Sequence, residues 1–168
     1  MDVSSAKEKQ ISAKIISESE ALTQREKWRA AGEKVVFTNG VFDILHAGHV
    51  RALAQSASCG DRLIIGLNTD LSVRKIKGPQ RPIISEQDRA YLLAALFFVD
   101  AIILFDDDTP LELIKSLMPD VLVKSADYTV EQIAGAKEVL ANGGRVELMP
   151  LVPGLSSTII IDKIRSAQ

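Results

Sequence analysis

Short apolar runs alternate with longer amphipathic segments along most of this chain. Four runs are apolar at nearly every position, as expected for strands buried on both faces of a sheet. A fifth run alternates polar and apolar residues, which indicates a position at the edge of the sheet. The pattern therefore predicts five strands, at residues 35–37, 63–67, 101–104, 121–123 and 145–148.

The segments between these runs have helix caps. Residues 109–112 combine a capping hydroxyl at Thr109, proline at the first helical position and glutamate at the third. Residues 129–132 repeat the capping-box pattern, and residues 85–88 are a weaker version. Helix ends at Gly60 and at residues 142–144 have the glycine that a left-handed cap requires.

Residues 6–31 have an apolar stripe at helical spacing, and Gly32 supplies a stop, so we expect one N-terminal helix. From there on, strands and helices alternate. This order favours an α/β fold with a doubly wound, parallel, five-stranded sheet and helices on both faces. We expect residues 1–32 to form a helical extension and residues 33–168 to form the main domain.

Composition adds few constraints. Apolar residues make up 46% of the chain and charged residues 25%, which is ordinary for a globular protein. The net charge of −2 gives no general attraction to nucleic acid or to an anionic membrane, so we expect neither as a partner. With one cysteine, no long apolar run and no signal-peptide pattern in the first residues, we expect a cytoplasmic protein without an internal disulfide.

Both histidines lie in one stretch, residues 38–49, directly after the first predicted strand. Ligands of parallel sheets bind at the carboxyl ends of strands, so this stretch is the first candidate site. The histidines could simply lie on a helix surface or in the core. A zinc site would have to recruit carboxylates, because no third histidine exists, and we predict no metal bound directly by the protein.

A phosphate site explains more of the stretch. Thr38-Asn39-Gly40 forms a small polar turn in which backbone amides can approach a ligand. His46 and His49 fall in the first turn of the next helix, whose amides and dipole favour anions. Gly48 leaves room between them. Imidazole donors there could stabilise charge on phosphate oxygens during a transfer reaction.

The string GVFDILHAGH, residues 40–49, resembles the cytidylyltransferase-like branch of the nucleotidyltransferase superfamily. The resemblance covers about residues 33–166 and implies a Rossmann-like fold. It is closest to the adenylyltransferase of ADP-heptose synthesis, in segments outside the shared motif. These segments are residues 68–70, 77–78 with 81–82, 99–100, 107–110, Lys124 with 127–128, and Gly135 with 141–144.

The resemblance implies transfer of AMP from ATP to D-glycero-β-D-manno-heptose 1-phosphate, giving ADP-heptose, a precursor of the lipopolysaccharide inner core, and pyrophosphate. It further implies Mg²⁺ bound with ATP, and a homodimer. Many family members carry this domain behind a sugar kinase, and we expect this chain to be the stand-alone form. One alternative is a cytidylyltransferase acting on glycerol 3-phosphate or a phospho-amino-alcohol. Another is a non-catalytic nucleotide-binding module.

A basic segment at residues 72–82 contains Arg74, Lys75, Lys77 and Arg81. Its glycine and two prolines favour a loop over a helix. It could be no more than a solvated basic loop. The alternative is a mobile lid that brings Lys77 onto the phosphates. The resemblance makes Lys77 catalytic with the two histidines and assigns Arg81 to substrate binding.

The remaining candidates follow from the resemblance. Nucleotide binding is assigned to Thr38, Asn39, Gly40, Phe42, Gly48, Arg89, Lys124, Asp127, Ser156, Ser157 and Thr158. The last three also fit a plain helix N-cap, and Arg89 also fits a charged helix face. Relatives of the heptose type have two glycines where Ser125 and Ala126 stand, which could narrow the base pocket.

Two aspartates are assigned to the substrate. Asp43 could contact sugar hydroxyls, or it could cap the helix that carries the histidines. Asp70 could bind substrate or Mg²⁺, or it could only form a turn at the end of the second predicted strand.

Overall fold

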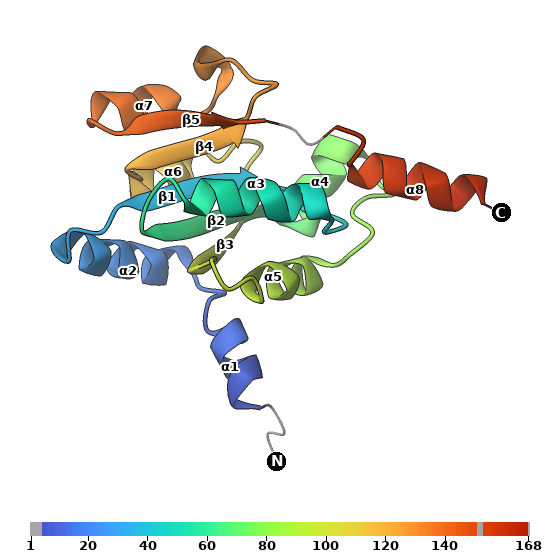
Figure 1. Cartoon of the computed structure of the whole chain (residues 1–168), viewed down its shortest axis with the longest axis horizontal. Coiled ribbons are helices and arrows are strands. Elements are labelled where there is room, and N and C mark those ends of the chain that lie inside the picture. Colours follow the sequence, from blue (N-terminus) through green and yellow to red (C-terminus); the bar gives the residue numbers. More distant parts are fainter. Residues whose placement is uncertain (1–4, 151–152, 168) are drawn as a thin grey trace.

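A computed structural model describes residues 5–150 and 153–167. The first residues, on which the expectation of no signal peptide rests, lie outside the described part. Five parallel strands form one sheet in the order β3-β2-β1-β4-β5 (Figure 1). The order reverses between β1 and β4, which is the doubly wound topology that the pattern predicts. The strands are β1 (Val35–Gly40), β2 (Arg62–Asn68), β3 (Ala101–Phe105), β4 (Val121–Ser125) and β5 (Arg145–Met149).

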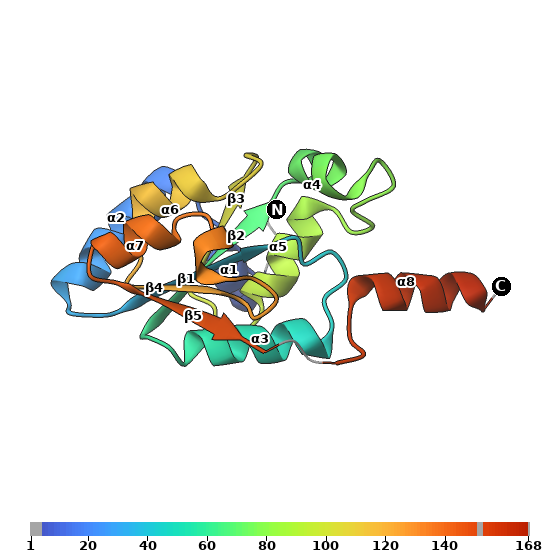
Figure 2. The same ribbon diagram turned by 90° about the horizontal axis from the view of Figure 1, so that it is seen from above.

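Helices cover both faces of the sheet (Figures 1 and 2). On one face, α3 (Ala47–Ala57) and α5 (Glu86–Ala94) pack Leu53 and Leu93 against strand residues such as Ile65. On the other, α2 (Glu18–Ala30), α6 (Leu111–Leu117) and α7 (Ala136–Ala141) pack against residues such as Phe37. Each fully buried side chain of this size contributes roughly 1.5–3 kcal/mol, so both layers stabilise the sheet.

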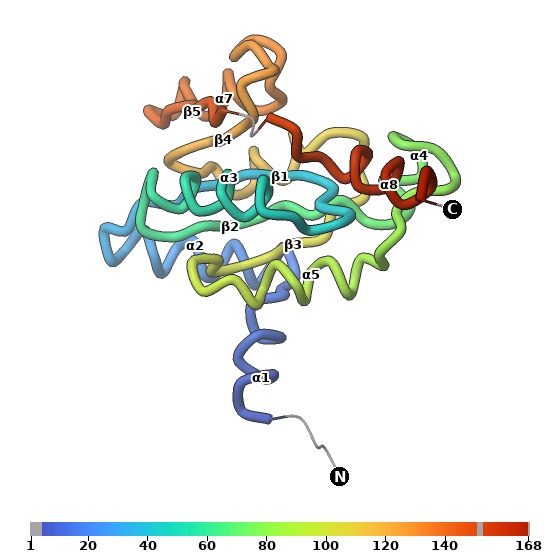
Figure 3. Tube along the Cα trace, turned by 45° about the vertical axis from the view of Figure 1, so that its right-hand side comes forward, coloured from blue at the N-terminus to red at the C-terminus, as the bar shows by residue number. Residues whose placement is uncertain are grey.

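The N-terminal segment differs from its prediction. Two helices form, α1 (Ala6–Ser12) and α2, because Ser17 and Glu20 make a capping box that starts a second helix. Between them the backbone runs beside β3, where the Ile16 amide donates to Ile102 and the Ile102 amide donates to Lys14. This contact covers part of the edge of β3, which is an outer strand of the sheet. In Figures 1 and 3, α1 extends away from the body of the molecule.

The predicted extension nevertheless shares the main core, because Ala21 and Trp28 of α2 belong to the cluster around Phe37. The boundary at residue 32 stays a prediction. Gly32 does adopt the left-handed conformation expected of a helix stop, with φ of 77°. No helix in the described part of the chain is long and apolar enough to cross a membrane.

The predicted caps gave mixed results. Ser85 caps α5 by accepting a hydrogen bond from the Asp88 amide, and Gly143 is left-handed as expected. A 3₁₀ turn, η1 (Val130–Gln132), follows Thr129. The cap at Thr109 was wrong, because α6 begins at Leu111 after Pro110 without a side-chain hydrogen bond.

The left-handed cap at Gly60 was also wrong. Helix α3 ends in right-handed geometry at Ser58. Glycine is needed at position 60 for a steric reason, because an added Cβ would lie 2.8 Å from the carbonyl oxygen of Lys34.

The basic segment is largely helical, contrary to the predicted loop. Helix α4 (Asp70–Lys77) is capped by Thr69, buries Ser72 and Val73, and ends at Gly78, whose φ is 92°. Its last turn holds three cations, which suit the negative end of the helix dipole. The glycine and prolines that suggested a loop lie beyond the helix, in residues 78–82.

Helix α8 (Ser157–Ser166) projects from the body near the carboxyl edge of the sheet (Figures 1 and 2). None of its described residues is buried. Ser157, in its first turn, donates a hydrogen bond to Ile44, and Arg165, near its end, reaches Gln80. The N-terminus of α8 lies close to the segment that follows β1, where Ser157 contacts Ile44.

Candidate active site

A cavity of about 410 Å³ opens at the carboxyl ends of β1, β4 and β5. Its size suits a small-molecule ligand, and it lies where the strand order reverses, as ligand sites of open α/β sheets do. Most of the predicted site residues line it. They are Thr38, Asn39, Gly40, Phe42, Asp43, His46, Gly48, His49, Lys77, Arg81, Lys124, Ser156, Ser157 and Thr158.

His46 is the N-cap of α3 and has extended backbone geometry. Its Nδ1 accepts a hydrogen bond of 3.4 Å from the amide of His49. A neutral imidazole that accepts at Nδ1 carries its proton on Nε2, so His46 presents an N–H donor at the other side of its ring. The alternative in which Asp43 caps this helix was therefore wrong.

The two imidazole rings stack, with centroids 3.8 Å apart and an angle of 20° between the planes. Burial lowers the pKa of His46. Burial also lowers the pKa of His49 to about 4, with a smaller contribution from His46 and an opposing hydrogen bond to the backbone of Ile44. Both rings are thus neutral at pH 7 before a ligand binds, which permits this close contact.

Three buried polar atoms on the cavity wall have no hydrogen-bond partner in the described structure. They are Oδ1 of Asn39, Nε2 of His46 and Nδ1 of His49. A buried polar group without a partner costs about 1–3 kcal/mol, so such groups call for an explanation. A polar ligand in the cavity would supply the missing partners.

Several groups around the cavity create a positive electrostatic potential in it. The N-termini of α3 and α8 both border it, and free amides at helix N-termini bind anions. Ser156 caps α8 by accepting from the Ile159 amide, while the Ser157 hydroxyl donates to the carbonyl of Ile44. Three cations, Lys77, Arg81 and Lys124, complete a wall suited to a polyphosphate.

Two glycines of the motif leave room for neighbouring side chains. An added Cβ on Gly48 would lie 3.0 Å from the His46 ring and 3.2 Å from the Cβ of Leu155. An added Cβ on Gly40 would lie 2.9 Å from the ring of Phe42. Phe42 itself has a φ of 47°, which is rare for a large residue, and its ring contacts His49 edge-on.

Lys124 leaves β4 toward the cavity, and burial lowers the pKa of its amine, while the Asp127 charge opposes this shift. Asp127 itself is exposed, accepts a hydrogen bond from Ser125 and does not line the cavity. Ser125 does line it, so one of the two residues expected to narrow the base pocket lies on the cavity wall.

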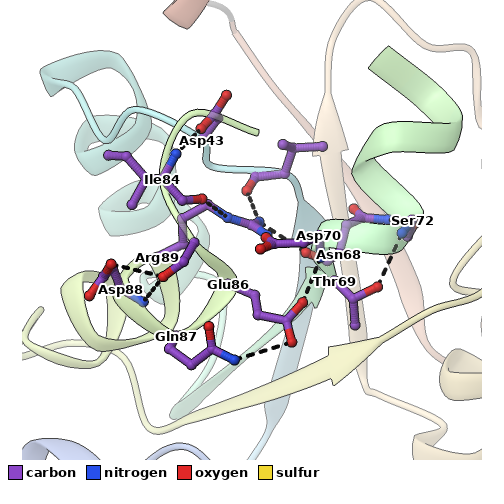
Figure 4. A network of polar contacts seen from close by, with 12 residues as sticks. Asp43, Asn68, Thr69, Asp70, Ser72, Ile84, Glu86, Gln87, Asp88 and Arg89 are labelled. Atoms are coloured by element: carbon purple, nitrogen blue, oxygen red, sulfur yellow. Dashed lines mark hydrogen bonds and ion pairs between the residues drawn. The ribbon is translucent and has the colours of Figure 1, made fainter. Parts of the chain in front are cut away.

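Arg89 and Asp70 are not brought into the cavity. Arg89 is 1% exposed, and all three of its guanidinium nitrogens have protein partners (Figure 4). One of these is Asp70, whose carboxylate lies 2.7 Å away. The sequence could not show this burial, because an arginine on an amphipathic helix is normally exposed.

Sequence reasoning missed several cavity residues. Ala52, Leu53 and Ser56 follow His49 at helical spacing on α3, so the helix period could have found them. Met149 and Pro150 follow β5, where the rule on carboxyl ends of strands also applies. The others are Val41, Val123 and Leu155.

No group of three or more metal-binding side chains occurs among the described residues. Asp43 is the one carboxylate of the described cavity wall, and it is already bound to Arg81. This donor set fits a Mg²⁺ ion held mainly by phosphate oxygens and water, as is usual when the ion arrives with a nucleotide.

Comparisons with known proteins agree with this geometry. The sequence profile of the Cytidylyltransferase-like family matches residues 37–163. The "Bifunctional protein HldE" of Methylobacillus flagellatus is 53% identical over 153 residues, which are 91% of this chain and 31% of that protein. The protein of the same name from Caulobacter vibrioides is 56% identical over 153 residues, again 91% of this chain and 32% of that protein. The chain thus spans about a third of the length of these curated relatives.

Two solved structures are also similar. The lipopolysaccharide core biosynthesis protein from Thermoplasma volcanium is 28% identical, with a TM-score of 0.57 over 72% of this chain and 98% of that one. The pantoate-beta-alanine ligase from Francisella tularensis, complexed with beta-gamma ATP and beta-alanine, has a TM-score of 0.58 at 16% identity. That alignment covers 90% of this chain and 77% of the ligase, and it shows a shared fold.

Proposed function

The chain belongs to the cytidylyltransferase-like family of nucleotidyltransferases, and from that premise we propose that it transfers AMP from ATP to D-glycero-β-D-manno-heptose 1-phosphate, forming ADP-heptose and pyrophosphate. The observation that carries the nucleotidyl chemistry is the set of unpaired polar atoms on a cavity wall that also has two helix N-termini and three cations. The choice of substrates draws on the relatives. One is called a bifunctional HldE protein and another a lipopolysaccharide core biosynthesis protein.

In the proposed reaction, an oxygen of the acceptor phosphate attacks the α-phosphorus of ATP in line, and pyrophosphate leaves. No covalent enzyme intermediate is needed, so catalysis consists of positioning and of stabilising charge. Mg²⁺, when bound with ATP, neutralises charge on the phosphate oxygens. The residues of this chain position the two substrates and stabilise the remaining negative charge.

His46 donates from Nε2 to a phosphate oxygen, because Nδ1 is already occupied by the backbone. His49 lies stacked on His46 with its Nδ1 unpaired at the cavity wall. Because its ring already donates to the backbone of Ile44, His49 donates from Nδ1 to the same group of phosphate oxygens once the ring is protonated. Lys77 reaches the same cavity from the last turn of α4 and adds a full positive charge. Thr158 and the amides of the first turn of α8 bind the leaving pyrophosphate in this scheme.

The experiment is a matrix of nucleoside triphosphates and acceptor phosphates, assayed for pyrophosphate release. We expect ATP to exceed CTP in kcat/KM by at least about tenfold, a difference of roughly 1.4 kcal/mol, because a site that binds one base edge leaves polar groups unpaired with another. Faster turnover of CTP with glycerol 3-phosphate would replace the proposal with a cytidylyltransferase. Binding of nucleotide without any turnover would leave a non-catalytic module.

A further inference from the structure

Asp43 lies in the histidine motif, but its carboxylate is directed at a distant part of the chain. Oδ1 accepts hydrogen bonds from the amides of Ile83 and Ile84, at 2.7 and 2.9 Å. Oδ2 accepts from Nε of Arg81 in an ion pair. The side chain of Asp43 is 0% exposed, so these three bonds account for its burial.

Arg89 connects the same segment, residues 81–84, to the ends of two strands. Its Nε donates to the carbonyl of Ile84, and its Nη1 donates to the carbonyls of Val41 and Asn68 (Figure 4). Val41 and Asn68 stand at the ends of β1 and β2. The backbone of Ile84 is therefore held at both its amide and its carbonyl, by one buried side chain on each side.

Arg81 is the residue that this arrangement places at the cavity. Its side chain is 18% exposed and lines the cavity wall, and Nε is the one guanidinium nitrogen with a partner among the described residues. A guanidinium fixed through Nε keeps its two terminal nitrogens in a plane that suits the paired oxygens of a phosphate.

We propose that Asp43 and Arg89 are positioning residues that fix residues 81–84, so that Arg81 presents its terminal nitrogens to the phosphate of the acceptor substrate. This inference rests on the proposed function, because it assigns a role within that reaction. It also replaces two expectations from the sequence. Asp43 acts through Arg81 rather than on sugar hydroxyls, and Arg89 acts through the backbone rather than on the nucleotide phosphates.

The positioning part can be tested without any substrate, by hydrogen exchange of the amides of Ile83 and Ile84. In Asp43→Ala, both amides lose their acceptor, so their exchange should accelerate by about tenfold or more. In Asp43→Asn, the remaining Oδ1 can still accept from both amides, and their protection should be largely kept. Unchanged exchange rates of these two amides in Asp43→Ala would overturn the proposal that Asp43 fixes this segment.

The substrate part is tested by steady-state kinetics of Asp43→Asn. The new NH₂ group faces Nε of Arg81, so two donors meet and Arg81 loses its alignment while its charge remains. We expect KM for the acceptor phosphate to rise at least about tenfold, with KM for ATP changed by less than about twofold. Asp61→Asn is the matched control, since Asp61 also accepts a backbone amide, that of Lys34, but near the start of β1.

A double mutant shows whether Asp43 acts through Arg81. Arg81→Ala should raise KM for the acceptor at least as much as Asp43→Asn does. If the two act as one unit, Asp43→Asn/Arg81→Ala should match Arg81→Ala alone within about twofold. Effects that multiply would show that Asp43 contacts the substrate itself, and equal changes in both KM values would show a general disturbance of the site. Either result overturns the proposal.

Arg89→Lys completes the test, because it keeps the charge but replaces the planar guanidinium by a single nitrogen that cannot reach all four acceptors of Arg89. We expect faster exchange at Ile84 and a raised KM for the acceptor. Failure of the proposed function looks different. The wild-type protein would then release no pyrophosphate with the heptose phosphate, while the exchange experiment would still decide whether Asp43 and Arg89 hold residues 81–84.

Discussion

Two polar clusters at the carboxyl edge of the sheet differ in whether their buried side-chain nitrogens have hydrogen-bond partners. In the histidine cluster, Nε2 of His46 and Nδ1 of His49 are buried without partners. In the arginine cluster, Arg89 is more deeply buried, yet each of its guanidinium nitrogens is bonded to a carbonyl or to Asp70 (Figure 4). Both clusters were assigned to the ligand from the sequence.

This difference distinguishes residues that can bind a ligand from residues that stabilise the fold around the site. A buried polar group that is fully paired stabilises the fold and has little capacity left for a ligand. A buried polar group without a partner costs stability in the absence of a ligand and gains a hydrogen bond when one arrives. The unpaired cluster is therefore the candidate for chemistry, and the paired cluster is its support. The four predictions that follow test this division.

The largest effect is expected on activity, in His49→Ala. Loss of one donor to the transition state should lower kcat by about 10²–10³, or roughly 3–4 kcal/mol. The free energy of unfolding should change by only about 1 kcal/mol, because the ring loses one hydrogen bond, to the backbone of Ile44, while the unpaired Nδ1 has no protein partner to lose. Kinetics and denaturant titration measure the two quantities. Phe97→Ala, at a side chain 92% exposed and outside the cavity, is the control.

The paired cluster should show the reverse, a loss of stability, in Arg89→Met. Removing the guanidinium leaves Asp70 and three carbonyls without their donor, so we expect the free energy of unfolding to fall by about 2–4 kcal/mol. Urea denaturation measures it.

Arg25→Met is a matched comparison for that variant. Arg25 is a second buried arginine, but its Nε and Nη1 are already unpaired, and it bonds through Nη2 to Met118 and Asp120. We expect this variant to cost less than Arg89→Met. An equal or larger cost would mean that pairing does not distinguish these two sites.

The neutral state of His49 makes the free energy of unfolding depend on pH, an effect of intermediate size. Its pKa is about 4 in the folded protein and near 6.5 when unfolded, so the unfolded chain binds the proton first as pH falls. Stability is therefore lost below about pH 6.5, and the loss levels off near pH 4. Between pH 7 and 5.5 we expect His49 to account for about 1 kcal/mol. The loss in this window should be smaller in His49→Gln than in the wild-type protein.

The smallest effect concerns the caps of the two helices that carry these clusters. Ser85 caps α5 through a hydroxyl, and Ser85→Ala should cost about 1 kcal/mol of unfolding free energy. His46 caps α3 through a longer bond of 3.4 Å from a ring nitrogen. His46→Ala should therefore cost less stability than Ser85→Ala while reducing activity far more. Thermal unfolding of both variants, beside their kinetics, gives the comparison.

Much of the fold could be read from local patterns. The five strands, the parallel α/β order and the outer position of β5 follow from runs of apolar residues and from caps a few residues apart. The histidine turn was found for the same reason, because its motif is contiguous and follows a strand. Helix α4 was missed because a glycine and two prolines, which favour a loop, follow it directly, while the burial of Ser72 and Val73 arises only from packing.

The sequence by itself thus determined the sheet, its carboxyl edge and the two histidines, since these depend on residues close together in the chain. Only the tertiary structure decided which polar residues at that edge are free to meet a ligand. Asp43 and Ile83 are 40 residues apart, and Arg89 and Val41 are 48 apart, so no local pattern records their hydrogen bonds. A carboxylate and a guanidinium look equally suited to a substrate until folding supplies each with its partner, and burial then makes that partner obligatory.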